Sequence, residues 1–275
     1  MQERKIHNYT LRGLCVIVLG IALLLTGGAN AVVSSIVVNP SGEILHQRNA
    51  KLVRYPASLT KLMTIYLAFE AIRDKKISFY DQIVVSKKAS SMPPSKIWLR
   101  PQDTISVRDA IMSLIVKSAN DSAVALAEHI GRTEYGFAEM MNKRAINLGM
   151  SKTSFENASG WHHRNQKTTA YDMAKLAIAI HRDFPEYYHM FSRKEFRYGT
   201  ACFRCKNYVF NNLDGAEGLK TGYTSKAGFN IVTSVQRNGV RLIGVVMGGK
   251  TNKQRDAEMM RLMNSQFAVL GRSQH

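Results

Sequence analysis

Three short polar motifs in this chain combine serine and lysine in a pattern that suits nucleophilic catalysis. Ser58 and Lys61 are the ends of an S-x-x-K motif, Ser118 and Asn120 are the ends of S-x-N, and Lys220 begins K-T-G. An S-x-x-K motif alone occurs by chance in many chains. All three motifs in this order, about 60 and 100 residues apart, are a much stronger signal. The set predicts a serine nucleophile that a lysine activates.

The spacing of the first motif has a physical reason. Residues at i and i+3 of a helix lie on one face, about 5–6 Å apart, so Lys61 can reach the hydroxyl of Ser58. Pro56 fits a helix that begins here. A serine in a first turn lies among unpaired backbone N–H groups, and its own N–H is a candidate oxyanion donor. Lys61 must be neutral to act as a base, and both burial and a nearby cation such as Lys220 would lower its pKa.

The second motif follows an apolar helical segment, so we expect it in a short loop between helices. There Ser118 can relay a proton to a leaving amine, and Asn120 can bind a substrate amide or fix Lys61. The alternative is that Asn120 is an ordinary cap of a helix that starts at Asp121.

The third motif falls on a predicted strand, which could pair with an extended peptide by edge addition. Lys220 and Thr221 could hold a substrate carboxylate, and Gly222 leaves space for a ligand beside the backbone. The N–H of Tyr223 could complete an oxyanion hole. The alternative is a simple junction between a strand and a turn.

The order of the predicted elements is strands, helices, strands and a final helix, which indicates an α+β fold. An antiparallel sheet shared by the two ends of the chain, with a helical insertion, would account for this order. The pair Asn238-Gly239 between two apolar runs is a strong hairpin signal. We expect strands at 36–38, 43–46, 219–222, 229–235 and 241–246, and helices at 58–72, 107–116, 121–130, 134–148, 173–180 and 254–270.

The N-terminus has the three parts of a secretory signal peptide. Arg4, Lys5 and Arg12 are basic, residues 14–25 are almost entirely apolar, and residues 29–31 are small. An apolar run of about 12 residues is short for a membrane span, so we expect cleavage after Ala31 rather than an uncleaved anchor. The predicted domains are a signal peptide at 1–31 and a catalytic domain at 32–275.

The charge and the cysteines restrict the partners and the metal chemistry. The formal net charge is +18, which favours anionic partners. Nucleic acid is one such partner, but export favours a carboxylate-rich cell wall or an anionic membrane surface. Cys202 and Cys205 form a lone C-x-x-C motif, which predicts a local disulfide or two inert thiols. A zinc site would need two more ligands at matching spacing, and the sequence shows none.

Several segments of the chain resemble the low-molecular-mass penicillin-binding proteins, the serine D-Ala-D-Ala carboxypeptidases. The resemblance covers roughly residues 34–270. The segments that carry it are 55–64 (YPASLTKLMT), 113–128 (SLIVKSANDSAVALAE), 218–224 (GLKTGYT) and 227–230 (AGFN).

The resemblance implies a DD-peptidase fold, in which an antiparallel sheet is flanked by helices and the active site lies beside a helical subdomain. Ser58 would attack the carbonyl between two D-alanines of a peptidoglycan stem peptide, release the terminal D-alanine and leave an acyl-enzyme for water to hydrolyse. β-Lactam antibiotics would acylate the same serine. The enzyme would be periplasmic or in the cell envelope and would need no metal or organic cofactor, and nucleic acid would not be a partner.

Two departures from the family pattern affect this interpretation. Many relatives carry a C-terminal β-sandwich and an amphipathic membrane helix, whereas this sequence stops at His275, so we expect a single catalytic domain. No E-x-x-L-N pattern is present, which disfavours a class A-like β-lactamase. A DD-endopeptidase using the same residues remains an alternative. A non-catalytic wall-binding protein would not need the intact set of motifs.

Overall fold

The computed structural model describes residues 33–272, which form a single compact unit. The predicted signal segment at 1–31 lies outside the described residues. None of the helices in the described part of the chain is long and apolar enough to cross a membrane.

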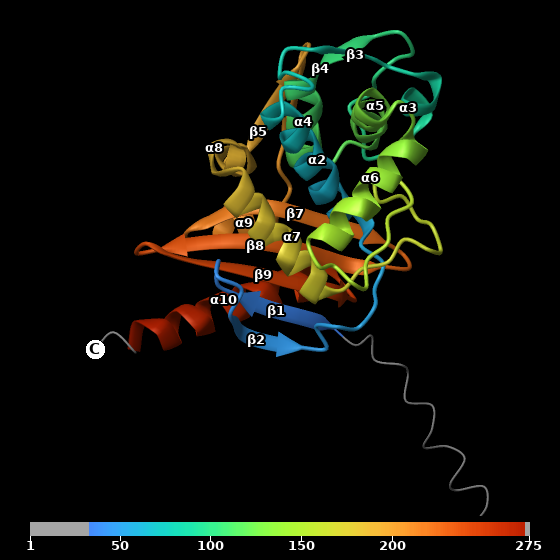
Figure 1. Ribbon diagram of the computed structural model, residues 1–275. Coiled ribbons are helices and arrows are strands. Elements are labelled where there is room, and N and C mark those ends of the chain that lie inside the picture. Colours follow the sequence, from blue (N-terminus) through green and yellow to red (C-terminus); the bar gives the residue numbers. More distant parts are fainter. Residues whose placement is uncertain (1–32, 273–275) are drawn as a thin grey trace, which may run out of the picture. The chain divides into compact units, whose positions relative to one another are not determined.

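The central element is a five-stranded antiparallel sheet in the order β2-β1-β9-β8-β7 (Figure 1). The two ends of the described chain meet in it, because β1 pairs with β9 with Ser34 opposite Met247. β8 and β9 are joined by the predicted Asn238-Gly239 turn. β7 is an edge strand. The strands span β1 Ser34–Val38, β2 Ile44–Arg48, β7 Ala216–Thr224, β8 Gly228–Arg237 and β9 Val240–Gly249.

Each face of the sheet is covered by helices because successive strand residues point to opposite sides. Ile36 belongs to the core on the side of α7 (Ala170–Asp183), whereas Val37 belongs to the core on the side of α10 (Asn252–Arg272). Figure 1 shows α10 below the sheet and α7 on the opposite face. The prediction of an α+β fold with a shared sheet is confirmed.

The remaining helices pack beyond α7 and form a helical region next to the β7 edge of the sheet (Figure 1). Two small two-stranded antiparallel sheets accompany them, β3 Gln82–Val84 with β4 Thr104–Ser106, and β5 Glu195–Tyr198 with β6 Ala201–Arg204. The helices are η1 Ala57–Thr60, α2 Lys61–Arg73, α3 Lys87–Ser91, α4 Val107–Val116, α5 Asn120–Gly131, α6 Glu134–Asn147, α8 Pro185–Tyr188, η2 His189–Ser192 and α9 Tyr208–Asn212.

Short polar side chains determine where two of the predicted helices begin. The hydroxyl of Ser106 accepts from the backbone N–H of Asp109 at 3.0 Å, and that of Thr169 accepts from the N–H of Asp172 at 3.0 Å. Each bond satisfies a backbone donor that the first turn would otherwise leave unpaired. The predicted start of α4 at residue 107 is confirmed, and α7 begins three residues before the predicted residue 173.

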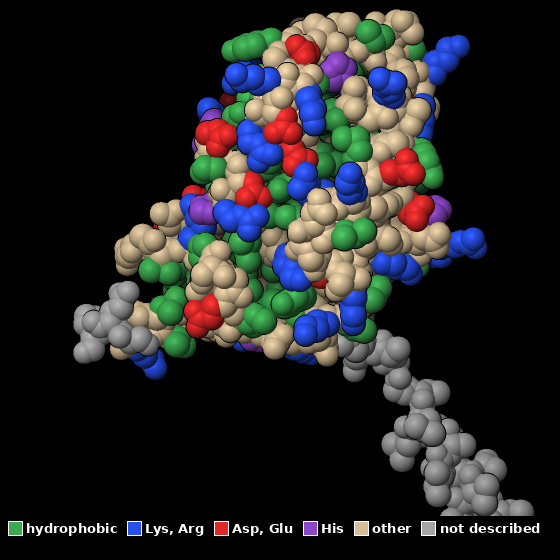
Figure 2. Space-filling view, in the orientation of Figure 1, with side chains coloured by type: hydrophobic (Ala, Val, Ile, Leu, Met, Phe, Trp, Pro, Cys, Tyr) green, Lys and Arg blue, Asp and Glu red, His purple; other side chains and the backbone are tan. Residues whose placement is uncertain are grey.

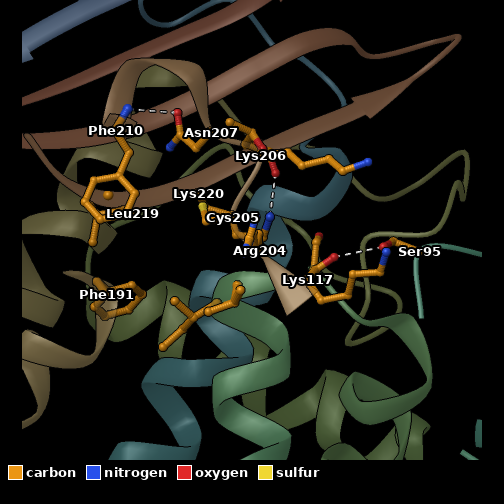
Figure 3. Close-up of a pocket in the computed structure, with 15 residues that line it drawn as sticks. Ser95, Lys117, Phe191, Arg204, Cys205, Lys206, Asn207, Phe210, Leu219 and Lys220 are labelled. Carbon is orange, nitrogen blue, oxygen red and sulfur yellow. Dashed lines mark hydrogen bonds between the residues drawn. The ribbon is translucent and has the colours of Figure 1, made fainter. Parts of the chain in front are cut away.

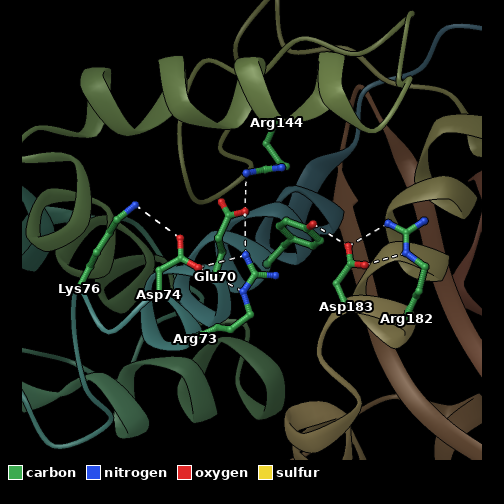
Figure 4. Close-up of polar contacts among 8 residues, drawn as sticks. Glu70, Arg73, Asp74, Lys76, Arg144, Arg182 and Asp183 are labelled. Atoms are coloured by element: carbon green, nitrogen blue, oxygen red, sulfur yellow. Dashed lines mark hydrogen bonds and ion pairs between the residues drawn. The ribbon is translucent and has the colours of Figure 1, made fainter.

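A polar cluster ties α2 to its neighbours, as Figure 4 shows. Glu70 of α2 accepts a short hydrogen bond from Arg144 of α6. The hydroxyl of Tyr66, also on α2, donates to Asp183 of α7 at 2.7 Å, and burial together with this carboxylate raises the pKa of Tyr66. Since α2 begins at Lys61, these contacts hold in place the helix that carries the predicted base.

The structure corrects the predicted start of the first long helix. We expected one helix from Ser58 to Ile72, but Ser58 lies in the 3₁₀ turn η1 and the α-helix begins only at Lys61. Ala57, just before Ser58, has a φ of +49°, which lies outside the α-helical region. The two small sheets were not predicted, because their strands of three or four residues are too short to show a clear alternation.

The two cysteines of the C-x-x-C motif are free thiols, so the predicted local disulfide is absent. Cys202 lies in β6, and the N–H of Cys205 continues the same ladder by donating to the carbonyl of Lys194 at 2.7 Å. Strand residues three apart point to opposite faces and are about 10 Å apart. A disulfide requires Cα atoms within about 7 Å, so this extended segment cannot form one.

Candidate active site

Ser58 lies in a strained turn on the wall of an open cavity of about 450 Å³. Ala57 before it has left-handed backbone angles, which are costly for a residue other than glycine. Two contacts hold this turn. The side-chain amide of Asn230 donates to the carbonyls of Tyr55 and Pro56 at 3.0 and 3.2 Å. Gly160 packs so closely that a methyl group there would lie 2.0 Å from the carbonyl oxygen of Ala57.

Lys61 is completely buried, although it is a lysine in the first turn of α2. Its Nζ lies 3.2 Å from Ser58 Oγ and 2.7 Å from Asn120 Oδ1, and it also donates to the carbonyl of Ser159. Burial lowers the pKa of Lys61 well below its usual value, and the positive charge of Lys220 lowers it further. The carboxylate of Asp121 acts in the opposite direction.

The three partners of Lys61 are suited to a neutral amine. The amide oxygen of Asn120 and the carbonyl of Ser159 can only accept hydrogen bonds, and together they take two N–H groups. A neutral amine has two N–H groups and one lone pair, so its lone pair would face Ser58 Oγ. This arrangement can remove the proton of the serine hydroxyl.

Asn120 begins α5, but it does not cap this helix. The N-cap residue is Ala119, and no side chain makes a capping bond there. The alternative that Asn120 is an ordinary cap is therefore wrong. Its side chain instead spans the site, because Oδ1 accepts from Lys61 and Nδ2 donates to the carbonyl of Pro93 at 2.8 Å. Ser118 has a φ of +63° and lines the same cavity as Ser58.

β7 forms the facing wall of the site. The K-T-G motif lies inside a nine-residue strand, so the alternative of a strand-to-turn junction is wrong. Gly222 passes so close to the nucleophile that a methyl group there would lie 2.9 Å from the backbone nitrogen of Ser58. Thr221 and Tyr223 line the Ser58 cavity. Lys220 is almost fully buried, and burial is the main reason that its pKa falls to about 8.

A smaller cavity of about 180 Å³ continues from the Ser58 cavity, and the two share Ser95, Ser118, Lys206 and Thr221. Figure 3 shows this cavity, with Phe191 and Phe210 on one side of the view and Lys117 and Lys206 on the other. No aspartate or glutamate is among the residues that line it. We call it the cationic cavity, after the four basic residues in its lining: Lys117, Arg204, Lys206 and Lys220.

The structure thus brings all eight predicted site residues around Ser58 and its neighbouring cavity, and it adds others that the sequence did not single out. The carbonyl of Ser159 is invisible to motif analysis because every residue has one. Gly160 and Asn230 act through close packing and backbone contacts. Asp121 is buried and accepts from the N–H groups of Ile97 and Leu99 at 3.1 Å, which ties the 93–99 loop to α5.

Comparison with known proteins gives a result that agrees with the geometry of the site. The family model described as D-alanyl-D-alanine carboxypeptidase matches residues 29–251. The D-alanyl-D-alanine carboxypeptidase DacD of Escherichia coli K12 is 39% identical over 230 residues, which are 81% of this chain and 59% of that protein. This chain therefore spans well under two thirds of the length of that relative.

Two solved structures have a similar fold. Penicillin-binding protein 5 of Haemophilus influenzae is 36% identical with a TM-score of 0.82, covering 86% of this chain and 70% of that one. Penicillin-binding protein D2 of Listeria monocytogenes, in an ampicillin-bound form, is 29% identical with a TM-score of 0.78, covering 85% and 96%. On the match of the family model to most of its length, this chain belongs to the D-alanyl-D-alanine carboxypeptidase family.

Proposed function

We propose that this protein is a serine DD-carboxypeptidase that removes the terminal D-alanine from peptidoglycan stem peptides. The observation that carries the proposal is the position of Lys61 Nζ, which lies 3.2 Å from Ser58 Oγ and is otherwise surrounded by acceptors. A buried lysine with a lowered pKa next to a serine is the arrangement that makes the hydroxyl nucleophilic.

The first half of the reaction forms an acyl-enzyme. Lys61 takes the proton of Ser58 Oγ, and the oxygen attacks the carbonyl carbon between the two D-alanines. The oxyanion would accept from the N–H groups of Ser58 and Tyr223, which belong to η1 and β7. As the C–N bond breaks, Ser118 gives its proton to the nitrogen and regains one from Lys61, which is the proton that Lys61 took from Ser58, and free D-alanine leaves. Water then attacks the ester, Ser58 regains its proton, and the shortened peptide is released.

Binding of the substrate follows from the edge position of β7 and from the charge beside it. An extended peptide can hydrogen-bond along β7 because it is an edge strand. Its terminal carboxylate would lie at Lys220 and Thr221, where the cationic cavity begins. Ampicillin is bound to the related D2 protein, and we propose that β-lactams acylate Ser58 in the same place.

We also propose that the enzyme works in the cell envelope. The basic and apolar segment at 1–31 would direct export, by cleavage or as an anchor, and residues 32–275 would form the catalytic domain. The excess of basic residues would favour contact with carboxylate-rich wall polymer and with an anionic membrane surface.

Mass spectrometry of the intact protein, with and without benzylpenicillin, tests the nucleophile. We expect a stable adduct of one penicillin on the wild type and none on Ser58→Ala. Ser90→Ala is a matched control, because this serine lies on α3 and lines neither cavity, and it should still form the adduct. Absence of an adduct with penicillin intact would overturn the proposal. Absence of an adduct with penicillin destroyed would indicate the β-lactamase instead.

Measuring the release of D-alanine from a stem pentapeptide distinguishes carboxypeptidase activity from endopeptidase activity. The leaving residue would lie next to a cavity of only about 180 Å³, which suits a single residue with a free carboxylate better than a cross-linked chain. We therefore expect faster release of D-alanine than cleavage of a cross-linked dimer. Faster cleavage of the dimer would favour the endopeptidase.

A further inference from the structure

The cavity of Ser58 has two chemically different ends. One end leads into the cationic cavity at Lys220 and Lys206. The other end contains aromatic side chains that do not line the cationic cavity, namely Trp161, Tyr223 and Phe229. A substrate whose carboxylate is held at the cationic end must place its acyl portion, on the other side of the scissile bond, towards the aromatic end.

Trp161 has an unusual position at this aromatic end. Its side chain is 48% exposed, and among the described residues its ring has no aromatic or cationic partner and belongs to neither hydrophobic core. Large aromatic rings contribute most to the free energy of folding or binding when they are buried. An exposed ring in the wall of a cavity therefore has apolar surface available for a ligand. Arg255 also lines this cavity, but its charge is already paired with Asp256 at 2.6 Å.

The backbone of Trp161 is firmly held, although its ring is free. Its N–H donates to Ser159 Oγ at 3.1 Å, and its carbonyl accepts from Asn157 Nδ2 at 2.9 Å and from Gln166 Nε2 at 3.2 Å. Gln166 is almost completely buried. The same short loop supplies the Ser159 carbonyl to Lys61, so the backbone that carries the ring has a fixed position relative to the nucleophile.

Tyr223 and Phe229 supply further apolar surface to the same cavity. Their rings stack at a centroid distance of 4.2 Å and an interplanar angle of 30°, and Tyr223 is 55% exposed. They lie at the paired positions of β7 and β8, next to the strand edge along which an extended peptide would run. Stacking fixes the ring of Tyr223 and leaves its other face open.

We propose that Trp161, with Tyr223, forms an apolar subsite for the acyl side of the substrate. Its occupant is the aliphatic side chain of the residue on the N-terminal side of the D-alanine whose carbonyl Ser58 attacks. In a penicillin, the acylamino side chain takes this place. The inference rests on the proposed acylation of Ser58 and adds the residue that selects the acyl donor. Trp161 takes no part in proton transfer. It therefore affects the selectivity of Ser58 among acyl donors and not the reactivity of the serine itself.

The test compares two penicillins that differ only in this side chain. Benzylpenicillin carries a phenylacetyl group, whereas 6-aminopenicillanic acid carries none. We expect Trp161→Ala to lower the second-order rate of acylation by benzylpenicillin about tenfold and to leave that by 6-aminopenicillanic acid nearly unchanged. Trp98→Ala is the matched control, because Trp98 is 68% exposed but lines neither cavity, and it should alter neither rate.

A second measurement does not depend on the rate. The chain has two tryptophans, so Trp98→Phe leaves Trp161 as the only indole. Acylation of this variant by benzylpenicillin should shift its fluorescence to shorter wavelength, because the phenylacetyl group covers the ring of Trp161. Acylation by 6-aminopenicillanic acid should cause no such shift. This measurement uses the intact Trp161 and is therefore independent of whether Trp161→Ala folds.

The outcomes separate the inference from the function on which it depends. Equal changes in the two rates for Trp161→Ala, or equal fluorescence with both compounds, would overturn the subsite and leave acylation of Ser58 intact. Failure of both compounds to acylate the wild type would instead overturn the proposed function. A loss confined to benzylpenicillin, together with the fluorescence shift, would support the subsite.

Discussion

The two lysines of the site have different surroundings, and for this reason we propose different roles for them. Lys61 is surrounded by acceptors and contacts the nucleophile, whereas Lys220 donates to the carbonyl of Thr221 at 2.7 Å and borders the cationic cavity. The sequence could predict both residues because the motifs specify side chains. It could not predict the Ser159 carbonyl, which completes the surroundings of Lys61, because that contact depends on a loop about 100 residues away.

The pH dependence of acylation should follow from this pair. Lys61 must be neutral to act, so the rate should rise with pH through its lowered pKa. The positive charge of Lys220 lowers that pKa, and its removal should raise it. We expect Lys220→Gln to move the acidic limb of the profile to higher pH. Lys220→Arg keeps the charge and should leave this limb in place.

The measurement is the second-order rate of acylation by benzylpenicillin as a function of pH. A second limb is expected near pH 8 in the wild type, where Lys220 loses its charge and holds the carboxylate less well. An acidic limb that does not move in Lys220→Gln would show that the charge of Lys220 has no effect on Lys61.

At the scale of elements, the turn that carries Ser58 is held between segments distant in sequence. β7 approaches it through Gly222, β8 holds it through Asn230, and the 157–161 loop closes on it through Gly160. Most long elements could be predicted from apolar periodicity and capping residues. The turn itself could not, because its strained backbone is imposed by these neighbours and not by local preference.

The close contact of Gly160 gives a prediction about this element. In Gly160→Ala the new methyl group would collide with the carbonyl of Ala57 and displace the loop or the turn. A displacement of about 1 Å at a reacting group can cost about 100-fold in rate, so we expect the acylation rate to fall by at least this much. Stopped-flow acylation with benzylpenicillin would measure the loss.

Gly239→Ala separates this collision from backbone strain. Gly239 has a φ of +77°, similar to the +81° of Gly160, but no atom lies within 4 Å of the position of its added methyl group. Its substitution should cost only about 1–2 kcal/mol of stability and leave acylation unchanged. Equal effects of the two substitutions on the acylation rate would show that the contact with Ala57 is unimportant.

The molecule as a whole combines a specific cleft with an excess of positive charge. Figure 2 shows lysine and arginine side chains spread over the face in view, with acidic side chains between them. The formal net charge of +18 could be read from the sequence, and so could the class of the fold. The position of the cationic cavity could not, because its four basic residues come from separate segments: Lys117 follows α4, Arg204 ends β6, Lys206 follows β6 and Lys220 lies in β7.

Binding to insoluble peptidoglycan should therefore depend on salt. Salt shortens the range of electrostatic attraction from about 10 Å at 0.1 M to about 3 Å at 1 M, so the fraction that sediments with wall polymer should fall as salt rises. Acylation by penicillin, measured in the same buffers, serves as the control for an intact site and should change little. Sedimentation that does not respond to salt would indicate that the net charge has no part in wall binding.

The pairing of β1 with β9 has a consequence for the time at which the enzyme becomes active. Strands more than 200 residues apart in the sequence, with Ser34 opposite Met247, must meet before the sheet is complete. Ordering such distant contacts is slow, and in the proposed export it cannot begin until the chain has been made and delivered as far as β9. Because β7 and β8 hold the Ser58 turn from within that sheet, the nucleophile has no site before the last strands arrive. Late assembly of this kind would keep a partly delivered chain from acting on the wall.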